Sequence, residues 1–335
     1  MTTMTMTRRL GRSGVEVSSL GVGCWAIGGP FWEDGRPLGW GEVDDDESVA
    51  ALHRALELGV TFFDTANVYG AGHSERVLGR AFAGRRDQVV IATKFGFTFD
   101  EASRETRGPD GTPAGLRRQL EASLRRLGTD FVDLYQLHIN DLPVPQALDL
   151  VPVLDELVDR GQVRAYGWST DHPERAAAFA DASRDVTAIQ HDFSVLNDSA
   201  DVLAVCERQD LASINRGPLA MGLLTGKFTA GSRLGDDDVR GVAPDWMVYF
   251  RDGRPAPELL QRIEAVREVL RSGGRTLAQG ALAYLWARSD RTVPIPGCRT
   301  VAQVEENAGA LAHGPLTTDQ ASEVDELLGR KSLDR

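Results

Sequence analysis

The sequence predicts an α/β fold in which eight parallel strands alternate with helices and close into a (β/α)8 barrel. Short apolar segments with strand character alternate with amphipathic helical segments about eight times, and the links between them are short. This order is typical of a parallel sheet, and eight such units are the number that closes a barrel. No linker, low-complexity segment or sequence repeat divides the 335 residues, so we expect a single domain over residues 1–335.

Local patterns predict each element in turn. A small N-terminal β-hairpin formed by residues 9–10 and 15–17 precedes the barrel. The first helix opens at Asp44, because carboxylates favour a helix N-terminus, and it ends at Gly59. A later helix carries a leucine every three or four residues between 116 and 127, which gives it one apolar face. The eight strands are expected at residues 20–23, 61–63, 89–93, 131–137, 163–168, 186–190, 211–214 and 292–295. Further helices are expected at 74–82, before Arg160-Gly161, at 174–182, at 200–209, twice after residue 255, and at 301–310.

Two long loops interrupt this alternation. Residues 28–41 follow the first strand and residues 217–255 follow the seventh. Long loops within a compact domain are usually functional or mobile. Both follow strands, so we expect both at the C-terminal face of the barrel, where barrel enzymes keep their active sites.

The composition argues against several kinds of binding partner. The net charge is −12 with no basic patch, which argues against a nucleic-acid partner. Cys24, Cys206 and Cys298 are far apart and odd in number, so neither a disulfide framework nor a cysteine metal site is indicated. Residues 1–9 are polar and no apolar run is long enough to span a bilayer. We therefore expect a cytoplasmic protein with no membrane partner.

Four polar side chains follow neighbouring strands of the predicted barrel. Asp64 ends the second strand and Tyr69 lies on its glycine-rich loop, while Lys94 follows the third strand and His138 the fourth. Neighbouring parallel strands bring these side chains to one mouth. Taken alone, the Asp64–Tyr69 segment is equally compatible with a capping carboxylate and a packed tyrosine.

The chemistry of the four residues predicts a proton donor. A buried lysine loses its proton unless a carboxylate such as Asp64 lies beside it. A charged Lys94 next to a phenol should lower the pKa of Tyr69 and make it a usable acid. His138 can donate a hydrogen bond in the same site and orient a carbonyl oxygen. An acid aimed at a carbonyl group requires a reductant.

In these motifs the sequence resembles the aldo-keto reductase superfamily over nearly its whole length. The motifs are FFDTANVYG (62–70), ATKFG (92–96), LYQLH (134–138), GWST (167–170), Gln190, GPLAMGLLTGKF (217–228) and IPGCRTVAQVEEN (295–307). The resemblance implies a TIM barrel that binds NADP(H) in extended form. It also implies that a small-molecule aldehyde or ketone is reduced to an alcohol by Asp64, Tyr69, Lys94 and His138.

The resemblance further implies a set of binding residues. Ser169, Thr170 and Gln190 would hold the nicotinamide carboxamide, although the family commonly has asparagine where Thr170 stands. Arg216 stands where many members stack an aromatic ring on the nicotinamide, and a guanidinium plane can also stack. The segment from Gly222 to Lys227, with Arg233, would wrap the pyrophosphate. The cofactor-binding set is Gly23, Cys24, Trp25, Asp64, Ser169, Thr170, Gln190, Asn215, Arg216, Gly217, Pro218, Leu219, Gly222, Leu224, Gly226, Lys227, Arg233, Gly297, Cys298, Arg299, Gln303, Glu306 and Asn307.

The same resemblance indicates the cofactor and the substrate pocket. Cys298, Arg299 and Gln303 match positions around the 2′-phosphate, where Arg299 can form a forked contact and backbone N–H groups at the helix start favour a phosphate. The competing interpretation is that Arg299 pairs with Glu305 or Glu306. The expected substrate pocket consists of Trp25, Trp32, Phe95, His138 and Trp168, and Trp40 and Trp246 are either core residues or part of it.

Other interpretations of the sequence fit its residues less well. Gly21-Val22-Gly23 suggests a Rossmann fingerprint, but the third glycine is misplaced. His191 and Asp192 could bind a metal with His138 and Asp64, as in a barrel hydrolase, but packing roles fit better and no metal is expected. The remaining alternative to a reductase is a weakly catalytic NADP-binding subunit with a redox-sensing or regulatory role. The sequence does not indicate the physiological carbonyl compound or the oligomeric state.

Overall fold

Eight parallel strands form an almost closed barrel in the computed structural model, which describes residues 6–330. The strands lie in the order β16-β13-β12-β11-β10-β7-β6-β3. A parallel bridge between Gly23 and Gly297 joins the two edges of this sheet. The strands are β3 (Gly21–Gly23), β6 (Phe62–Asp64), β7 (Val90–Phe95), β10 (Val132–Leu137), β11 (Val163–Ser169), β12 (Val186–Asp192), β13 (Ala212–Arg216) and β16 (Thr292–Pro294). The predicted barrel is confirmed; the outermost residues of the predicted domain 1–335 lie outside the described part.

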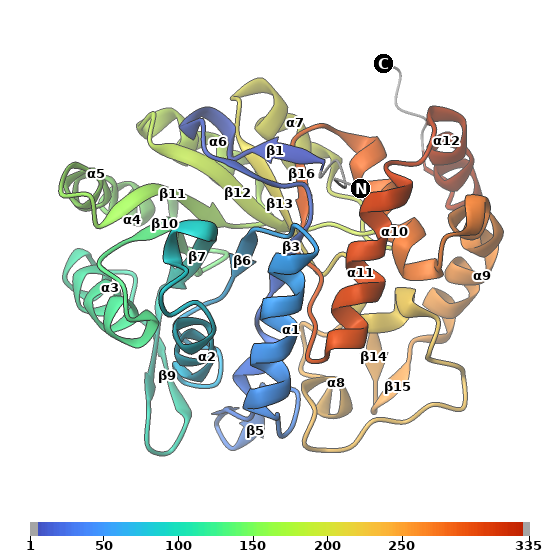
Figure 1. The fold of residues 1–335 in the computed structure, drawn as a ribbon, viewed down its shortest axis with the longest axis horizontal. Coiled ribbons are helices and arrows are strands. Elements are labelled where there is room, and N and C mark those ends of the chain that lie inside the picture. Colours follow the sequence, from blue (N-terminus) through green and yellow to red (C-terminus); the bar gives the residue numbers. More distant parts are fainter. Residues whose placement is uncertain (1–5, 331–335) are drawn as a thin grey trace.

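Helices surround the barrel (Figure 1). They are α1 (Asp45–Glu57), α2 (His73–Ala81), α3 (Pro113–Leu127), α4 (Val144–Leu148), α5 (Val151–Asp159), α6 (Pro173–Ala182), α7 (Ala200–Arg208), α9 (Pro257–Arg271), α10 (Leu277–Arg288), α11 (Val301–His313) and α12 (Thr318–Leu327). The Asp44 side chain caps α1 by accepting hydrogen bonds from the backbone N–H groups of residues 46 and 47, as the acidic run predicts. The sequence patterns did not predict α12. Among residues 6–330, no helix is long and apolar enough to cross a bilayer.

The apolar core has two layers. Strand residues that point inward, such as Phe62, Leu134 and Val293, fill the barrel, and Leu10 and Val17 of the N-terminal hairpin close the end where the strands begin. Residues that point outward pack against the helices. The hairpin pairs β1 (Thr7–Arg9) with β2 (Glu16–Ser18), so both strands are shifted from the predicted positions by one or two residues.

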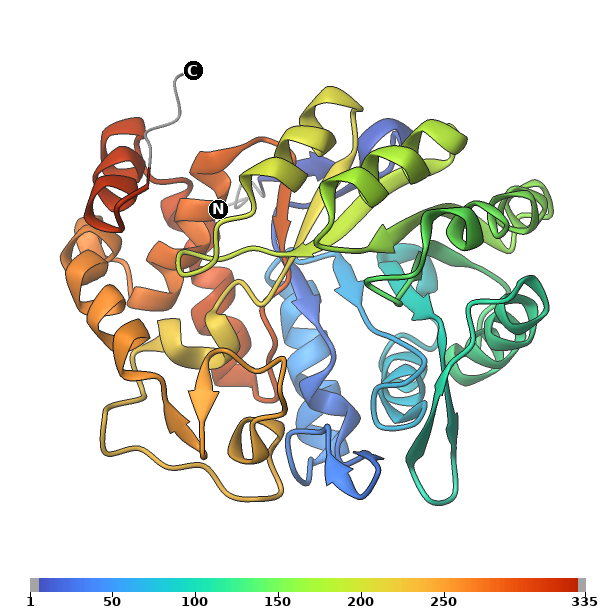
Figure 2. The same cartoon turned by 180° about the vertical axis from the view of Figure 1, so that it is seen from behind.

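Three insertions, not two, gather at the end of the barrel opposite the hairpin (Figures 1 and 2). The first contains β4 (Trp32–Glu33) and β5 (Arg36–Pro37). The second, which was not predicted, is the hairpin of β8 (Phe97–Asp100) and β9 (Glu105–Pro109), and it joins β4 and β5 in a small sheet. The third contains η4 (Ala220–Thr225), α8 (Val239–Val242), β14 (Phe250–Arg251) and β15 (Arg254–Pro255). All three follow barrel strands, so they build the rim of the C-terminal mouth.

Candidate active site

A buried ion pair lies at the floor of this mouth. Lys94 Nζ is 2.5 Å from Asp64 Oδ1, and the two side chains are 0% and 3% exposed. The ammonium also donates to the backbone carbonyl of Thr65 at 2.8 Å. Asp64 ends β6 and Lys94 lies one residue before the end of β7, and these strands are direct neighbours. The sequence prediction that Asp64 and Lys94 meet is borne out by this geometry.

Two glutamines support the other oxygen of Asp64. Gln136 Nε2 and Gln190 Nε2 donate to Oδ2 at 3.0 Å and 2.8 Å, and Gln190 also donates to Gln136 Oε1 at 3.2 Å. The Gln190 amide is therefore engaged below the mouth, whereas the resemblance assigned it to the nicotinamide carboxamide. Sequence analysis missed Gln136, although its position two residues before His138 on an apolar strand places both on one face.

The loop after β6 positions Tyr69 above the ion pair. Lys94 Nζ lies 3.4 Å from the Tyr69 hydroxyl, and the Trp25 ring stacks on the phenol ring with 5.8 Å between centroids. Gly70 allows this arrangement, because its φ is 60° and a Cβ there would lie 1.8 Å from the carbonyl oxygen of Gly28. Tyr69 is thus fixed between the floor and the rim.

Burial changes the expected acidity of this cluster. Burial opposes protonation of Lys94, but Asp64 and then Tyr69 more than offset it, so the pKa of Lys94 is raised and the amine stays charged. For Tyr69, burial outweighs the attraction of Lys94, and the pKa of the phenol is raised above 10. The expectation of a lowered Tyr69 pKa was wrong, because burial raises the pKa by more than Lys94 lowers it, and Asp64 also offsets part of the lysine charge. The phenol therefore remains protonated at neutral pH.

His138 forms the next side of the mouth and is neutral. Burial, with the charges of Lys94 and Arg216, lowers the pKa of its imidazole well below 6.5. Its ring packs edge-on against Tyr69 and Phe97, with centroid distances of 5.7 Å and 5.5 Å. The buried Nδ1 atom has no hydrogen-bond partner within residues 6–330. This arrangement provides a neutral imidazole next to a protonated phenol.

Aromatic residues from two insertions form the upper wall. Trp25 contacts Trp40 and Trp246, with centroids 5.4 Å and 6.3 Å apart. Trp246 is 53% exposed and reaches the mouth from the third insertion. The wall makes the space above Tyr69 largely apolar.

The structure corrects part of the expected substrate pocket. Phe95 and Trp168 are 0% exposed and pack between the sheet and the helices, against Tyr135 and Phe179. Strand alternation explains this, since Lys94 points into the barrel and its neighbour must point out. Phe97, just past the end of β7, is the residue that reaches His138. Trp32 lies in β4 at the rim.

A cluster of cations lies beyond the mouth, along the segment that follows β13. The pKa of Lys227 is lowered by burial and by the nearby charges of Arg240 and Arg299. Arg240 donates to both Asp238 oxygens, at 2.8 Å and 2.5 Å, and stacks on Trp40. Sequence analysis missed Arg240 and proposed Arg233, which is exposed and makes no ion pair within the described residues. Arg240, unlike Arg233, is buried and paired with a carboxylate.

At the start of α11, the side chain of Arg299 and two of the backbone N–H groups contact protein groups that the sequence did not predict. Arg299 Nη1 donates to the Trp40 carbonyl at 2.8 Å, so it does not pair with the glutamates of α11. The Gln303 side chain accepts from the Arg299 backbone N–H, and Glu47 accepts from the Val301 N–H at 2.9 Å. The expected backbone phosphate site is therefore partly occupied by protein groups, and the guanidinium of Arg299 is the main remaining donor.

Other predicted residues take varied positions. The Thr170 hydroxyl donates to the Asn140 carbonyl at 2.8 Å, while Ser169 makes no side-chain hydrogen bond within residues 6–330. Arg216 pairs with Asp171, a residue that sequence analysis missed. The remaining residues of the predicted cofactor-binding set lie in three places. Near the ends of β3 and β13 are Gly23, Cys24, Asn215, Gly217, Pro218 and Leu219. In or next to η4 are Gly222, Leu224 and Gly226. After β16 are Gly297, which bridges to Gly23, the buried Cys298, and Glu306 and Asn307 of α11.

The histidine considered as a metal ligand is a packed residue. His191 contacts Ser199 and Ser213 with its two ring nitrogens, each at 2.7 Å, and burial lowers its pKa to about 3. No group of three or more His, Cys, Asp or Glu side chains suited to a metal occurs among residues 6–330.

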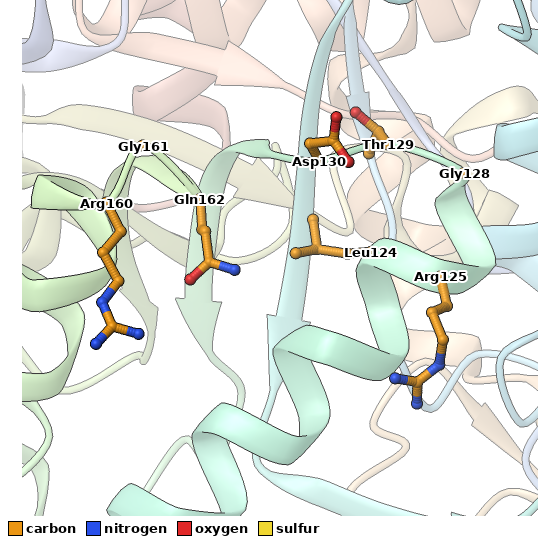
Figure 3. A pocket seen from close by; sticks show the side chains of 8 residues that line it. All are labelled: Leu124, Arg125, Gly128, Thr129, Asp130, Arg160, Gly161 and Gln162. Carbon is orange, nitrogen blue, oxygen red and sulfur yellow. The ribbon is translucent and has the colours of Figure 1, made fainter.

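A surface hollow at the other end of the barrel is unrelated to this chemistry. It lies at the turns before β10 and β11 (Figure 3). Its lining residues are Leu124, Arg125, Gly128, Thr129, Asp130, Arg160, Gly161 and Gln162. These turns enter the N-terminal ends of their strands, whereas Asp64, Lys94 and His138 lie at the C-terminal ends.

Comparison with known proteins identifies the family of this chain. The model of the aldo/keto reductase family matches residues 19–329. The chain belongs to the aldo/keto reductase family. It is 31% identical to the aldo-keto reductase YhdN of Bacillus subtilis over 304 residues, covering 88% of this chain and 85% of the relative. It is 28% identical to the aldo-keto reductase yakc [NADP(+)] of Schizosaccharomyces pombe, covering 91% and 86%.

Solved aldo-keto reductases share the fold. The glycerol dehydrogenase AKR11B4 from Gluconobacter oxydans is 28% identical, with a TM-score of 0.79 and coverage of 98% of this chain and 96% of that one. AKR11C1 from Bacillus halodurans, in its holo form, is 26% identical with a TM-score of 0.76, covering 98% and 97%. The (β/α)8 barrel and the oxidoreductase class of this chain follow from these relationships.

Proposed function

We propose that this aldo-keto reductase uses NADPH to reduce an aldehyde or ketone to an alcohol, with Tyr69 as the general acid. The observation that carries the proposal is the buried Lys94–Asp64 pair, whose ammonium lies 3.4 Å from the Tyr69 hydroxyl. A protonated phenol held by a fixed cation can release its proton as negative charge develops on a carbonyl oxygen.

Each residue of the cluster has a separate task in this proposal. Tyr69 Oη holds the proton, and Lys94 stabilises the phenolate that remains. Asp64 keeps Lys94 charged, and the two glutamines fix Asp64. His138, neutral at physiological pH, donates a hydrogen bond that orients the carbonyl oxygen. The tryptophan wall excludes water from this space and accepts the apolar part of the substrate.

The chain also contains groups that suit NADP(H). The charges of Arg240 and Arg299 act on Lys227, and because Arg240 is paired with Asp238, Lys227 and Arg299 are the cations that suit a phosphate. Gly222 has a φ of 95°, and a Cβ there would lie 3.3 Å from the Phe228 ring, so both the backbone conformation and the space favour glycine at this turn. The yeast relative named with NADP(+) supports the same cofactor. When bound, NADPH supplies the hydride.

The substrate of this chain is a small molecule that contains a carbonyl group or, in the opposite direction, an alcohol. The relative named glycerol dehydrogenase indicates that this scaffold also serves alcohol oxidation. The same residues would act in reverse, with Tyr69 accepting the proton that it donates during reduction.

NADPH oxidation with a panel of aldehydes and ketones tests the proposal. The protein should oxidise NADPH only when a carbonyl compound is present, and apolar aldehydes should be favoured. Tight NADPH binding without turnover on any member of the panel would contradict the reductase and support the weakly catalytic, redox-sensing subunit.

A further inference from the structure

We propose that Arg216 makes this site bind NADPH more tightly than NADP+, and that its ion pair with Asp171 limits this preference. The inference rests on the proposed function, because it concerns the cofactor of that reaction. Arg216 carries a positive charge at a position where many family members have an uncharged aromatic ring, and this charge is the basis of the proposed preference.

Arg216 lies at the mouth, facing the catalytic cluster. It is the last residue of β13, is 37% exposed, and forms an ion pair with Asp171 through Nη2 alone. Its charge acts on both Tyr69 and His138, which stand on the opposite side of the barrel. Asp171 also accepts a hydrogen bond from the Asp192 backbone N–H at 2.8 Å, so the pair is anchored to β12.

The position of Arg216 along the chain places it beside the nicotinamide. The hydride donor must meet the same carbonyl carbon that Tyr69 and His138 address, so the nicotinamide lies in the mouth. The cations around Lys227 and Arg299 would hold the phosphates. Residues 216–227 connect these two regions, and Arg216 is at the end nearest Tyr69.

Charge then distinguishes the two forms of the cofactor. The nicotinamide ring is neutral in NADPH and carries one positive charge in NADP+. A guanidinium against the ring repels only the oxidised form, whereas an aromatic ring would not repel it. Asp171 offsets part of the guanidinium charge, so the two residues act in opposite directions.

The consequence is a shifted equilibrium between bound cofactors. Stronger binding of NADPH than NADP+ raises the reduction potential of the bound couple by about 30 mV for each tenfold difference in affinity. It also promotes release of NADP+ after carbonyl reduction.

Fluorescence titration of NADPH and competition by NADP+ measure the ratio of the two dissociation constants, Kd(NADP+)/Kd(NADPH). Arg216→Met should lower this ratio roughly tenfold, since a charge at this range contributes on the order of that change after partial compensation. Asp171→Asn should raise the ratio by about threefold, because only the carboxylate of Asp192 then still offsets the arginine charge. Arg216→Lys retains the charge and should keep most of the wild-type ratio.

A cofactor fragment without nicotinamide, 2′-phospho-adenosine diphosphoribose, provides the control. Its affinity should be the same in all four proteins, whereas a general distortion of the site would weaken it together with both cofactors. A ratio unchanged in both Arg216→Met and Asp171→Asn overturns the inference while leaving the reductase proposal intact. Failure of the wild-type protein to bind either cofactor would overturn the proposed function itself.

Discussion

Lys94 Nζ lies 2.5 Å from Asp64 Oδ1, and both side chains are shielded from solvent. Burying two charges costs several kcal/mol for each ion, and apolar residues of similar size are often as stabilising. The pair is therefore poorly explained by stability alone. Its proximity to the Tyr69 hydroxyl explains it as a device that holds a cation beside a phenol.

Replacing either member of the pair should nearly abolish turnover. Lys94→Met removes the cation beside the phenol, and Asp64→Asn removes the charge that keeps Lys94 protonated. Each should reduce kcat/KM by about two or more orders of magnitude. The double variant should lose little more than the single ones, because the residues act as one unit. Losses that multiply in the double variant would show that the two act independently.

The pH dependence of reduction should be flat around neutrality. Reduction needs the protonated phenol, which is present below its pKa, and the pKa of Tyr69 is raised above 10, so activity should fall only in strong alkali. The pKa of His138 lies well below 6.5, so its titration should produce no change near that pH. Measuring kcat from about pH 6 to about pH 10 checks both points. A decline that begins below about pH 8 would contradict the raised phenol pKa.

The barrel could be predicted from sequence because each strand and helix has its own local pattern. Strand β6 and helix α1 are bounded by glycines and carboxylates whose preferences agree with the fold. The hairpin β8–β9 was missed because its residues are half-exposed and lack a clear alternation. Its position depends on pairing with β4, a contact that no local pattern reveals.

The catalytic cluster could be predicted because its members follow consecutive strands. The error over Phe95 and Trp168 came from counting residues at strand ends without their alternation. The raised pKa of Tyr69 depends on the balance between burial and the opposite charges of Lys94 and Asp64. This balance depends on three-dimensional distances that the sequence does not contain. Arg240 was missed for a similar reason, since its partners Asp238 and Trp40 lie in two different insertions.

Gly70→Ala should disturb Tyr69 without changing any catalytic group. A Cβ at this position would lie 1.8 Å from the Gly28 carbonyl oxygen, and φ is 60°. We expect a loss of about 1–3 kcal/mol in the free energy of unfolding and a marked loss of kcat. Gly84→Ala is a matched control, because φ is 74° there and a Cβ would meet nothing within 4 Å. Equal effects of the two substitutions would show that the contact with Gly28 is unimportant.

Arg299 should control the choice between NADPH and NADH. Its guanidinium is oriented by the Trp40 carbonyl and lies near Lys227. A charge-assisted contact to a phosphate contributes about 1.5–3 kcal/mol, so Arg299→Ala should weaken NADPH by about ten- to a hundredfold and NADH much less. Arg254→Ala, an exposed arginine of the third insertion, is the control. Equal weakening of both cofactors, or of neither, would refute the role of Arg299 at the 2′-phosphate.

The most direct test of the central claim is the kcat of Tyr69→Phe with an aldehyde that the wild-type protein reduces, measured together with the dissociation constant of NADPH. The substitution keeps the ring that packs on Trp25 and removes only the hydroxyl beside Lys94. We predict that kcat falls by about two or more orders of magnitude while NADPH affinity stays within about twofold. A Tyr69→Phe protein with a kcat close to wild type would contradict the assignment of Tyr69 as the proton donor.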